Sequence, residues 1–428
     1  MLKQKNFILY WFGQFVSSLG SSMTSFAITI WAYQKTGSVL TLSISGVLVM
    51  LPRMIGGFFA SPFIDRLNKK TVILLSDLTA GLCTLTLFFL LLGGNLEIWH
   101  IYVLNFITSV LGSFQNPAGA VMTSLLVPKE YLVKAGGLQS FADGTVQILS
   151  PVLAAAMLVI TGMNGVIAFD FITMLFACGT LLFLVKIPAH ILPEKARFDY
   201  RRYFCDLREG VYAVFRKPIL RLLTLFHVFI NFIAGITYFN LISPMILLKT
   251  NNNAQAVALV NSGMGIGSIV GGFLIALLPT PKSKVKTMFL CCGLSFVLGD
   301  LSFALGSSIW IWVAAGFFSN ILIPPYAANE NYIWRRSIPL EMHGRAFSIK
   351  YAVQAGSIPL GMILGGLFVD NILEPFMAND NTIFNMLLGS EKGSGMALMF
   401  LITGITGAII CLCGFFSQKL TRMESDLQ

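Results

Sequence analysis

Charge is scarce in this 428-residue chain. Only 11% of its residues are Asp, Glu, Lys or Arg, whereas a soluble domain carries about 25%. Its mean hydropathy is +0.78. Such a composition excludes an ordinary soluble globular protein. The net charge of +10 is therefore not a nucleic-acid footprint, because basic loops beside anionic lipid head groups explain it.

Several signatures of chemistry are also missing. The seven cysteines show neither a disulfide pattern nor metal-ligand spacing, and we expect them to be packing residues. The chain has no Gly-x4-Gly-Lys-Ser/Thr loop, no His-Glu-x-x-His and no Gly-x-Ser-x-Gly elbow. An intramembrane aspartyl protease needs a glycine before such a segment and a second aspartate motif, and Leu298-Gly299-Asp300 has neither. We therefore expect no enzyme, no metal and no cofactor.

Twelve apolar runs are present instead, each near the ~20 residues that a helix needs to cross a bilayer. The predicted fold class is an all-α polytopic membrane protein. Gly263, Gly267 and Gly271 recur every four residues on the eighth run, which predicts close helix packing there. The runs are 7–33, 41–63, 71–93, 99–120, 135–160, 165–187, 219–247, 254–279, 287–306, 309–332, 346–369 and 396–417.

The basic residues sort by side when the loops are assigned alternately to two faces. Twenty-five of the 29 fall on one side, Lys350 among them, and only Lys35, Lys249 and Lys392 fall on the other. Arg53 lies inside a run. Loops rich in Lys and Arg stay cytoplasmic, so we expect a multi-pass protein of the cell membrane with both termini in the cytoplasm.

The two halves of the chain resemble each other. Val127-Pro128-Lys129-Glu130 precedes the fifth run, and Ile338-Pro339-Leu340-Glu341 precedes the eleventh. Repeated six-helix halves are typical of secondary transporters that bind cargo between the halves. We predict two six-helix bundles, 1–187 and 219–428, joined by a cytoplasmic linker, 188–218, with an amphipathic surface helix.

A loop between the second and third runs carries a recognisable motif. Its sequence, Ser61-Pro62-Phe63-Ile64-Asp65-Arg66-Leu67-Asn68-Lys69-Lys70, resembles the signature loop of the major facilitator superfamily, with Ser61 and Asn68 in place of glycines. The resemblance implies a conformational latch at the cytoplasmic face. Its members would be Asp65, Arg66, Lys69, Lys70 and Asp77.

Other segments are similar to one branch of that superfamily. Ser150-Pro151-Val152-Leu153-Ala154 resembles its antiporter motif, through Ser150, Pro151 and Ala154, and the segment from His343 to Ser348 resembles the bacterial macrolide and multidrug effluxers. The resemblance implies export of amphipathic compounds by proton antiport with alternating access. One departure is Thr108, which stands where that branch usually has an arginine, and Arg53 is a candidate substitute.

Charged side chains at bilayer depth cost at least ~2.5–3.5 kcal/mol each, so they need partners or a wet cavity. Asp143 shares one helix face with Gln139 and Gln147 at a spacing of four. Arg53 and Asp143 form a transport pair, form a structural ion pair or do not touch, and the sequence leaves all three open. We expect Asp170 and Asp300 nearer the outer surface, where water could solvate them.

Further polar residues lie in the C-terminal half. Glu330 either faces a cavity as a proton or cation site or pairs with Arg335 or Arg336. His227 is either a packed residue or a proton carrier. The complete candidate set for substrate or proton binding is Arg53, Gln139, Asp143, Gln147, Asn231, Tyr326, Glu330 and Gln354.

The expected partners are an amphipathic small molecule, protons as the coupling ion and membrane lipids, with no nucleic acid, and we expect a monomer. An alternative keeps the fold and changes the cargo to a lysophospholipid, a siderophore or a peptide natural product. A more distant alternative is a membrane sensor that does not transport.

Overall fold

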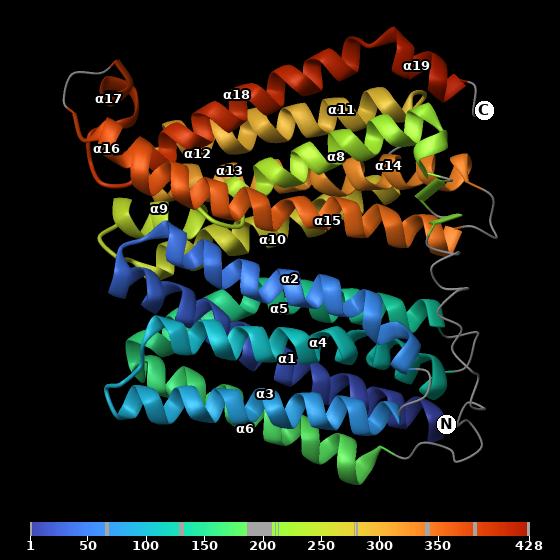
Figure 1. Cartoon of the computed structure of the whole chain (residues 1–428), viewed down its shortest axis with the longest axis vertical. Coiled ribbons are helices and arrows are strands. Elements are labelled where there is room, and N and C mark those ends of the chain that lie inside the picture. The colour runs from blue at the N-terminus through green and yellow to red at the C-terminus, as the bar shows by residue number, and fades with distance from the viewer. Residues whose placement is uncertain are drawn as a thin grey trace. The chain divides into compact units, whose positions relative to one another are not determined.

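The computed structural model describes residues 2–425, except for 65–67, 128–131, 186–207, 210, 213, 278, 280, 339–342 and 380–382. Throughout this described part the regular elements are helices and no strand occurs (Figure 1). The described helices form two compact units. Unit 1 comprises residues 1–37 and 44–198, and unit 2 comprises 38–43 and 199–428. Most of the predicted linker lies outside the described residues, and the domain boundaries stay a prediction.

Unit 1 contains the helices α1 and α3 to α6 and the part of α2 from Ile44 onward. Helix α1 packs against α5 and α6, and α3 packs against α4 and α6. Its core gathers Tyr10, Ile73, Met122 and Leu181. The helices are α1 (Leu2–Thr36), α2 (Val39–Ile64), α3 (Lys69–Leu92), α4 (Ile98–Leu126), α5 (Leu132–Ile160) and α6 (Gly162–Gly179), which continues as the π-helical turn η2 (Thr180–Leu184).

Unit 2 has more interruptions. Helix α8 lies beside α15, and α11 lies beside α18 (Figure 1). The elements are α8 (Pro218–Ile236), α9 (Ile242–Lys249), α10 (Ala254–Leu277), α11 (Lys284–Ser295), η4 (Phe296–Leu301), α12 (Ser302–Leu305), α13 (Ile309–Ile321), α14 (Ile323–Ser337), α15 (His343–Phe368), η6 (Val369–Leu373), α16 (Glu374–Met377), α17 (Ile383–Leu388), α18 (Ser394–Phe416) and α19 (Gln418–Ser425).

The predicted membrane fold class is confirmed. Ten described helical spans are long and apolar enough to cross a membrane. The first and fourth predicted runs also fall on long helices, α1 with 35 residues and α4 with 29. These two are richer in polar side chains, such as Gln14 and Gln115. The twelve predicted runs therefore each correspond to helical structure.

Three predicted runs have different boundaries from those expected. The run 219–247 is broken by a turn between α8 and α9, and 309–332 is broken at Leu322. Pro324 and Pro325 open α14 at this second break, because a proline has no N–H for the preceding turn and fits the start of a helix. The third of these runs, 346–369, was predicted to end too early, because η6 and α16 continue the helical structure as far as Met377.

Glycines bring two helix pairs into backbone contact. The stripe on α10 lies on the α13 backbone: a Cβ built at Gly263 would lie 3.0 Å from the Val313 carbonyl oxygen. This confirms the predicted close packing. Gly235 of α8 and Gly361 of α15 are arranged reciprocally, since a Cβ at Gly235 would lie 3.1 Å from Ile358 Cα and a Cβ at Gly361 would lie 3.1 Å from the Ile236 nitrogen. Helices α8 and α15 are thus tightly joined.

Candidate functional site

A buried ionic cluster centres on Glu330 of α14 in unit 2. The Glu330 side chain is only 3% exposed. One carboxylate oxygen, Oε2, lies 3.0 Å from Lys350 Nζ of α15. The other, Oε1, accepts a hydrogen bond of 3.1 Å from Gln354 Nε2 and lies 3.1 Å from His227 Nδ1 of α8. One carboxylate therefore ties together α8, α14 and α15.

Lys350 is enclosed on several sides. Its side chain is 2% exposed, and its ammonium group donates to Asn331 Oδ1 at 2.9 Å. The ammonium also lies 5.2 Å from the centroid of the Trp334 ring, within the range of a cation–π interaction. A buried ammonium needs such partners because desolvation would otherwise cost several kcal/mol.

His227 can connect the carboxylate to a phenol. Its Nδ1 lies 2.7 Å from the Tyr326 hydroxyl and faces Glu330 Oε1. An ionised carboxylate only accepts hydrogen bonds, whereas an imidazole nitrogen donates or accepts according to its tautomer. His227 Nδ1 therefore lies within hydrogen-bond distance of both the Glu330 carboxylate and the Tyr326 hydroxyl.

The cluster includes four of the predicted candidates. Tyr326, Glu330 and Gln354 share the contacts described above, and Asn231 Nδ2 donates to the Gln354 backbone carbonyl at 3.0 Å. The sequence analysis did not include Lys350 among the candidates, because it counted this residue with the basic residues of the cytoplasmic side. The position of Lys350 inside the predicted run 346–369 could have indicated that it belongs to the site. The structure also pairs Glu330 with Lys350 and His227; the Arg335 side chain lies outside the described residues.

The unit 1 candidates are arranged more openly. Asp143 accepts a 3.0 Å hydrogen bond from Gln139, and both side chains are exposed, as is Gln147. Arg53 and Asp143, both described, form no ion pair with each other. The Arg53 guanidinium instead lies against Gly112 of α4, where a Cβ would be 3.3 Å from Nε. Arg53 thus approaches α4 one turn from Thr108.

The predicted latch is only partly described, since Asp65 and Arg66 lie outside the described residues. Asp77 is buried on α3 and accepts hydrogen bonds from Gln14 (2.9 Å) and Gln115 (2.6 Å). Lys70 Nζ donates to the carbonyls of Leu182 (3.1 Å) and Val185 (2.9 Å). The last carbonyls of a helix have no donor within the helix, and the Lys70 ammonium supplies one at the end of η2.

Lys69 is also buried, at 5% exposure. The N-terminus of α3 is capped by Asn68, whose side chain accepts from the Lys70 N–H at 3.1 Å. This cap gives a physical reason for asparagine at a position where the family pattern has glycine.

Asp170 and Asp300 correct a prediction. We expected them near solvent, but they are 3% and 0% exposed. Asp170 accepts from Ser21 (2.9 Å) and Thr84 (3.1 Å). Asp300 accepts from the hydroxyls of Tyr238 (2.9 Å) and Thr403 (3.1 Å). Their position along the helix suggested exposure, whereas their helix faces point into the bundles.

The antiporter-like segment lies inside unit 1. Pro151 is within α5, and Ser150 and Ala154 are 4% and 0% exposed. Ala154 packs in a cluster with Met23, Ala27 and Val166. These contacts describe packing, and a role of this segment in transport stays a prediction.

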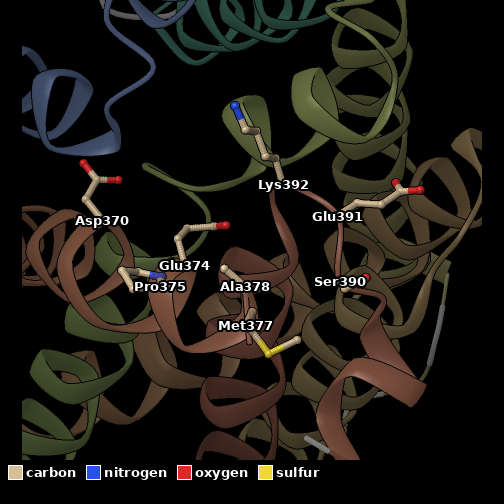
Figure 2. Close-up of a pocket in the computed structure, with 8 residues that line it drawn as sticks. All are labelled: Asp370, Glu374, Pro375, Met377, Ala378, Ser390, Glu391 and Lys392. Atoms are coloured by element: carbon tan, nitrogen blue, oxygen red, sulfur yellow. The ribbon is translucent and has the colours of Figure 1, made fainter. Parts of the chain in front are cut away.

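Unit 2 also has a cavity of about 310 Å³ near the end of α15 (Figure 2). Asp370, Glu374 and Glu391 contribute carboxylates and Lys392 an ammonium group. Glu374 accepts from the N–H groups of Gly393 (3.3 Å) and Met396 (3.2 Å), so it serves the N-terminus of α18. No pattern in the sequence indicated this cavity.

Comparison with known families identifies the architecture. The model of the Major Facilitator Superfamily matches residues 10–280, which is more than half of the chain. The chain belongs to the major facilitator superfamily. The predicted family is thereby confirmed, and this is a family of transporters, in keeping with the prediction that the chain is not an enzyme.

Two relatives and one solved structure illustrate the similarity. Macrolide efflux protein A of Streptococcus pyogenes is 26% identical over 372 residues, covering 86% of this chain and 90% of that protein. An enterobactin exporter of Shigella flexneri is 26% identical over 185 residues, 42% of each chain. A bacterial homologue of the lysosomal transporter Spinster, crystallised inward-facing and unoccupied, has a TM-score of 0.70 at 13% identity, covering 100% of this chain and 98% of that one. That last likeness concerns the fold alone.

Proposed function

We propose that this major facilitator protein exports amphipathic compounds, macrolides or multiple drugs, and that proton entry drives the export. The observation that carries the proposal is the buried Glu330–Lys350 pair with His227 beside it. The macrolide efflux relative supports the class of cargo, since its similarity extends over most of both chains.

Glu330 is the proposed proton acceptor. Protonating its carboxylate removes the attraction that holds Lys350 of α15 and His227 of α8 to α14. A ligand, here a proton, shifts a two-state equilibrium when it binds one state better than the other. The contacts of Glu330 with α8 and α15 support this proposal, because a protonated Glu330 would no longer attract Lys350 as an ion pair.

The substrate would bind elsewhere, on the polar face of α5. Gln139, Asp143 and Gln147 are exposed from unit 1, and Arg53 supplies a cation where the usual arginine of this branch is replaced by Thr108. Few polar anchors among many apolar side chains suit a large amphipathic ligand.

The first experiment is efflux of erythromycin and ethidium from cells that lack their own pumps. We expect extrusion that stops when a protonophore collapses the proton gradient. Glu330→Gln should abolish coupled efflux, because the amide can neither take up a proton nor hold Lys350 as an ion pair. The protein level in the membrane is measured in parallel.

Glu97→Gln is the matched control. Glu97 forms an ion pair of 3.5 Å with Lys35, and its side chain is 60% exposed, so its loss should leave efflux intact. Extrusion that continues unchanged with protonophore, or in Glu330→Gln, would contradict the proton mechanism. Absence of extrusion in well-expressing cells would contradict the drug cargo.

A siderophore is the second candidate cargo. The enterobactin exporter relative favours it, although the similarity covers less than half of each chain. The discriminating measurement is secretion of a catecholate siderophore from cells without their own exporter. Secretion without drug extrusion would favour this cargo over the macrolide class.

For the topology, we propose a protein of the cell membrane with both termini in the cytoplasm. Moving Lys350 from a loop to a buried site changes the charge asymmetry by one residue, so the basic loops still support this orientation. A reporter enzyme that is active only outside the cytoplasm, fused after Gln428, should remain inactive. Activity of this fusion would reverse the orientation.

A further inference from the structure

A single buried carboxylate lies between three helices of unit 1. Asp170 of α6 is 3% exposed. Its Oδ1 accepts a hydrogen bond of 2.9 Å from Ser21 of α1, and its Oδ2 accepts one of 3.1 Å from Thr84 of α3. No basic side chain of the described residues forms an ion pair with this carboxylate. Hydroxyl groups therefore bind both of its oxygens but leave its negative charge uncompensated.

A third hydroxyl at the same place lacks a hydrogen bond. Thr24, which follows Ser21 by three residues on α1, is 5% exposed, and its buried Oγ1 has no hydrogen bond of ordinary geometry to any described residue. It nevertheless faces the Asp170 carboxylate. A buried hydroxyl without a partner is unfavourable. A ligand that binds oxygen atoms between Thr24 and Asp170 would remove this cost.

The backbone of α1 comes close to α6 at this level. A Cβ built at Gly20 would lie 3.0 Å from Asp170 Cα and 3.3 Å from Asp170 Oδ1. The absence of a side chain at Gly20 thus lets the helix that carries two of the hydroxyls approach the carboxylate. Ser21 is itself exposed, so a small ion can reach the carboxylate past the Ser21 hydroxyl.

The assembled donors are all oxygen atoms, which suit hard cations. Asp170 supplies two carboxylate oxygens, and Ser21, Thr24 and Thr84 supply one hydroxyl oxygen each. A hydroxyl has one donor and two acceptor lone pairs, so Ser21 and Thr84 can donate to the carboxylate and still bind a cation. One carboxylate balances one positive charge, whereas Ca²⁺ takes about six to eight oxygen ligands. The short distances between these oxygens favour Na⁺ over the larger K⁺.

We propose that Asp170, Ser21, Thr24 and Thr84 form a Na⁺ site that joins α1, α3 and α6 within unit 1. Bound Na⁺ compensates the charge of the carboxylate and gives the Thr24 oxygen a partner. The site stabilises the packing of these three helices. The inference concerns unit 1 alone, and it is independent of the cargo and of the proposed proton coupling through Glu330.

The test is thermal unfolding of the purified full-length protein in detergent, with choline chloride replaced stepwise by NaCl at constant ionic strength. A ligand that binds only the folded state raises the unfolding temperature with its concentration. We expect a rise of several degrees with Na⁺ and little change with KCl in its place. Asp170→Asn should abolish the rise, because the amide carries no charge to balance Na⁺. Thr24→Val keeps the shape of the side chain but removes its oxygen, so it should need several-fold more Na⁺ for half of the effect.

Thr86→Val is the matched control for Thr84→Val. Both threonines lie on α3, but Thr86 is exposed and donates to the Leu82 carbonyl of its own helix (2.8 Å). Thr84→Val should weaken the response to Na⁺ several-fold, whereas Thr86→Val should leave it unchanged. Asp300→Asn removes a comparably buried aspartate of unit 2 and should also leave the response unchanged.

An unfolding temperature that does not depend on Na⁺ would overturn the proposal and would indicate that a proton neutralises Asp170. An equal rise with K⁺, or a rise that persists in Asp170→Asn, would also overturn it. If Asp170→Asn does not fold, Thr24→Val and Thr84→Val decide by comparison with Thr86→Val. The assay contains neither a substrate nor a proton gradient, so a negative result leaves the efflux proposal standing, and a failed efflux assay leaves the Na⁺ site testable.

Discussion

The predicted sequence repeat makes helices α5 and α15 counterparts, yet the residues at their corresponding positions lie in opposite environments. Gln139 lies as far after the proline that precedes α5 as Lys350 lies after the proline that precedes α15. Asp143 and Gln354 correspond in the same manner. On α5 the pair is exposed and bonded to itself, whereas on α15 both residues are buried and bound to Glu330.

Under the proposed function, the two corresponding helices have different tasks. When a buried charge has its partners on other helices, any movement of those helices changes the free energy of its interactions. An exposed polar face at the corresponding place is free to bind something from outside the bundle. We therefore expect substitutions on α15 to change stability and transport together, and substitutions on α5 to change transport alone.

The largest effect should come from breaking the α15 pair. Lys350→Ala leaves the Glu330 carboxylate buried without its cation, and the loss of one partner of a buried pair typically costs ~3–5 kcal/mol. Thermal unfolding of the purified protein in detergent measures this loss. The double variant Glu330→Gln/Lys350→Met should recover most of the stability without recovering proton-coupled efflux. A double variant as unstable as the single one would show that the ion pair is not the cause.

An intermediate effect, on transport only, is expected on α5. Asp143→Asn should change the free energy of unfolding by no more than ~0.5 kcal/mol, because the side chain is exposed. Efflux should nevertheless fall several-fold, and Arg53→Ala should behave similarly. Full efflux in both variants would leave this face without a role and would remove the contrast with α15.

The smallest effect should come from the exposed ion pair of Lys35 and Glu97. Their side chains are 37% and 60% exposed, and surface pairs contribute about 0–1 kcal/mol. Lys35→Gln should therefore shift thermal unfolding only slightly, and less in high salt than in low salt. A loss as large as that of Lys350→Ala would indicate that burial is not what distinguishes the two pairs.

The membrane fold was predictable because apolar length and the bias of basic loops act over whole segments. Twelve runs and the motif from Ser61 to Lys70 were sufficient for the family. The break at Pro324 and Pro325 was also visible in principle, since adjacent prolines are strong helix signals. The end of the eleventh run at 369 was misplaced because η6 and α16 continue the helix through polar residues such as Asp370 and Glu374.

The site was less predictable, because it depends on which face of each helix points inward. Glu330 and Gln354 were found as polar residues in apolar runs, but their common partner Lys350 was assigned to a loop from its charge alone. Asp170 and Asp300 were misjudged for the same reason, since depth along a helix does not determine burial. Asp170 and its partner Ser21 are separated by 149 residues, and no local pattern connects them.

Helix α15 carries Lys350 and Gln354 near one end and leads to Gly366 and Asp370 at the other. At 1.5 Å per residue, the distance from Lys350 to Asp370 is ~30 Å, roughly the thickness of the hydrocarbon core. Reciprocal glycines fix this helix to α8 along the way. Under the proposed function, the two joined helices would move as one rigid body, so that a displacement at the Lys350 end also displaces the Asp370 end.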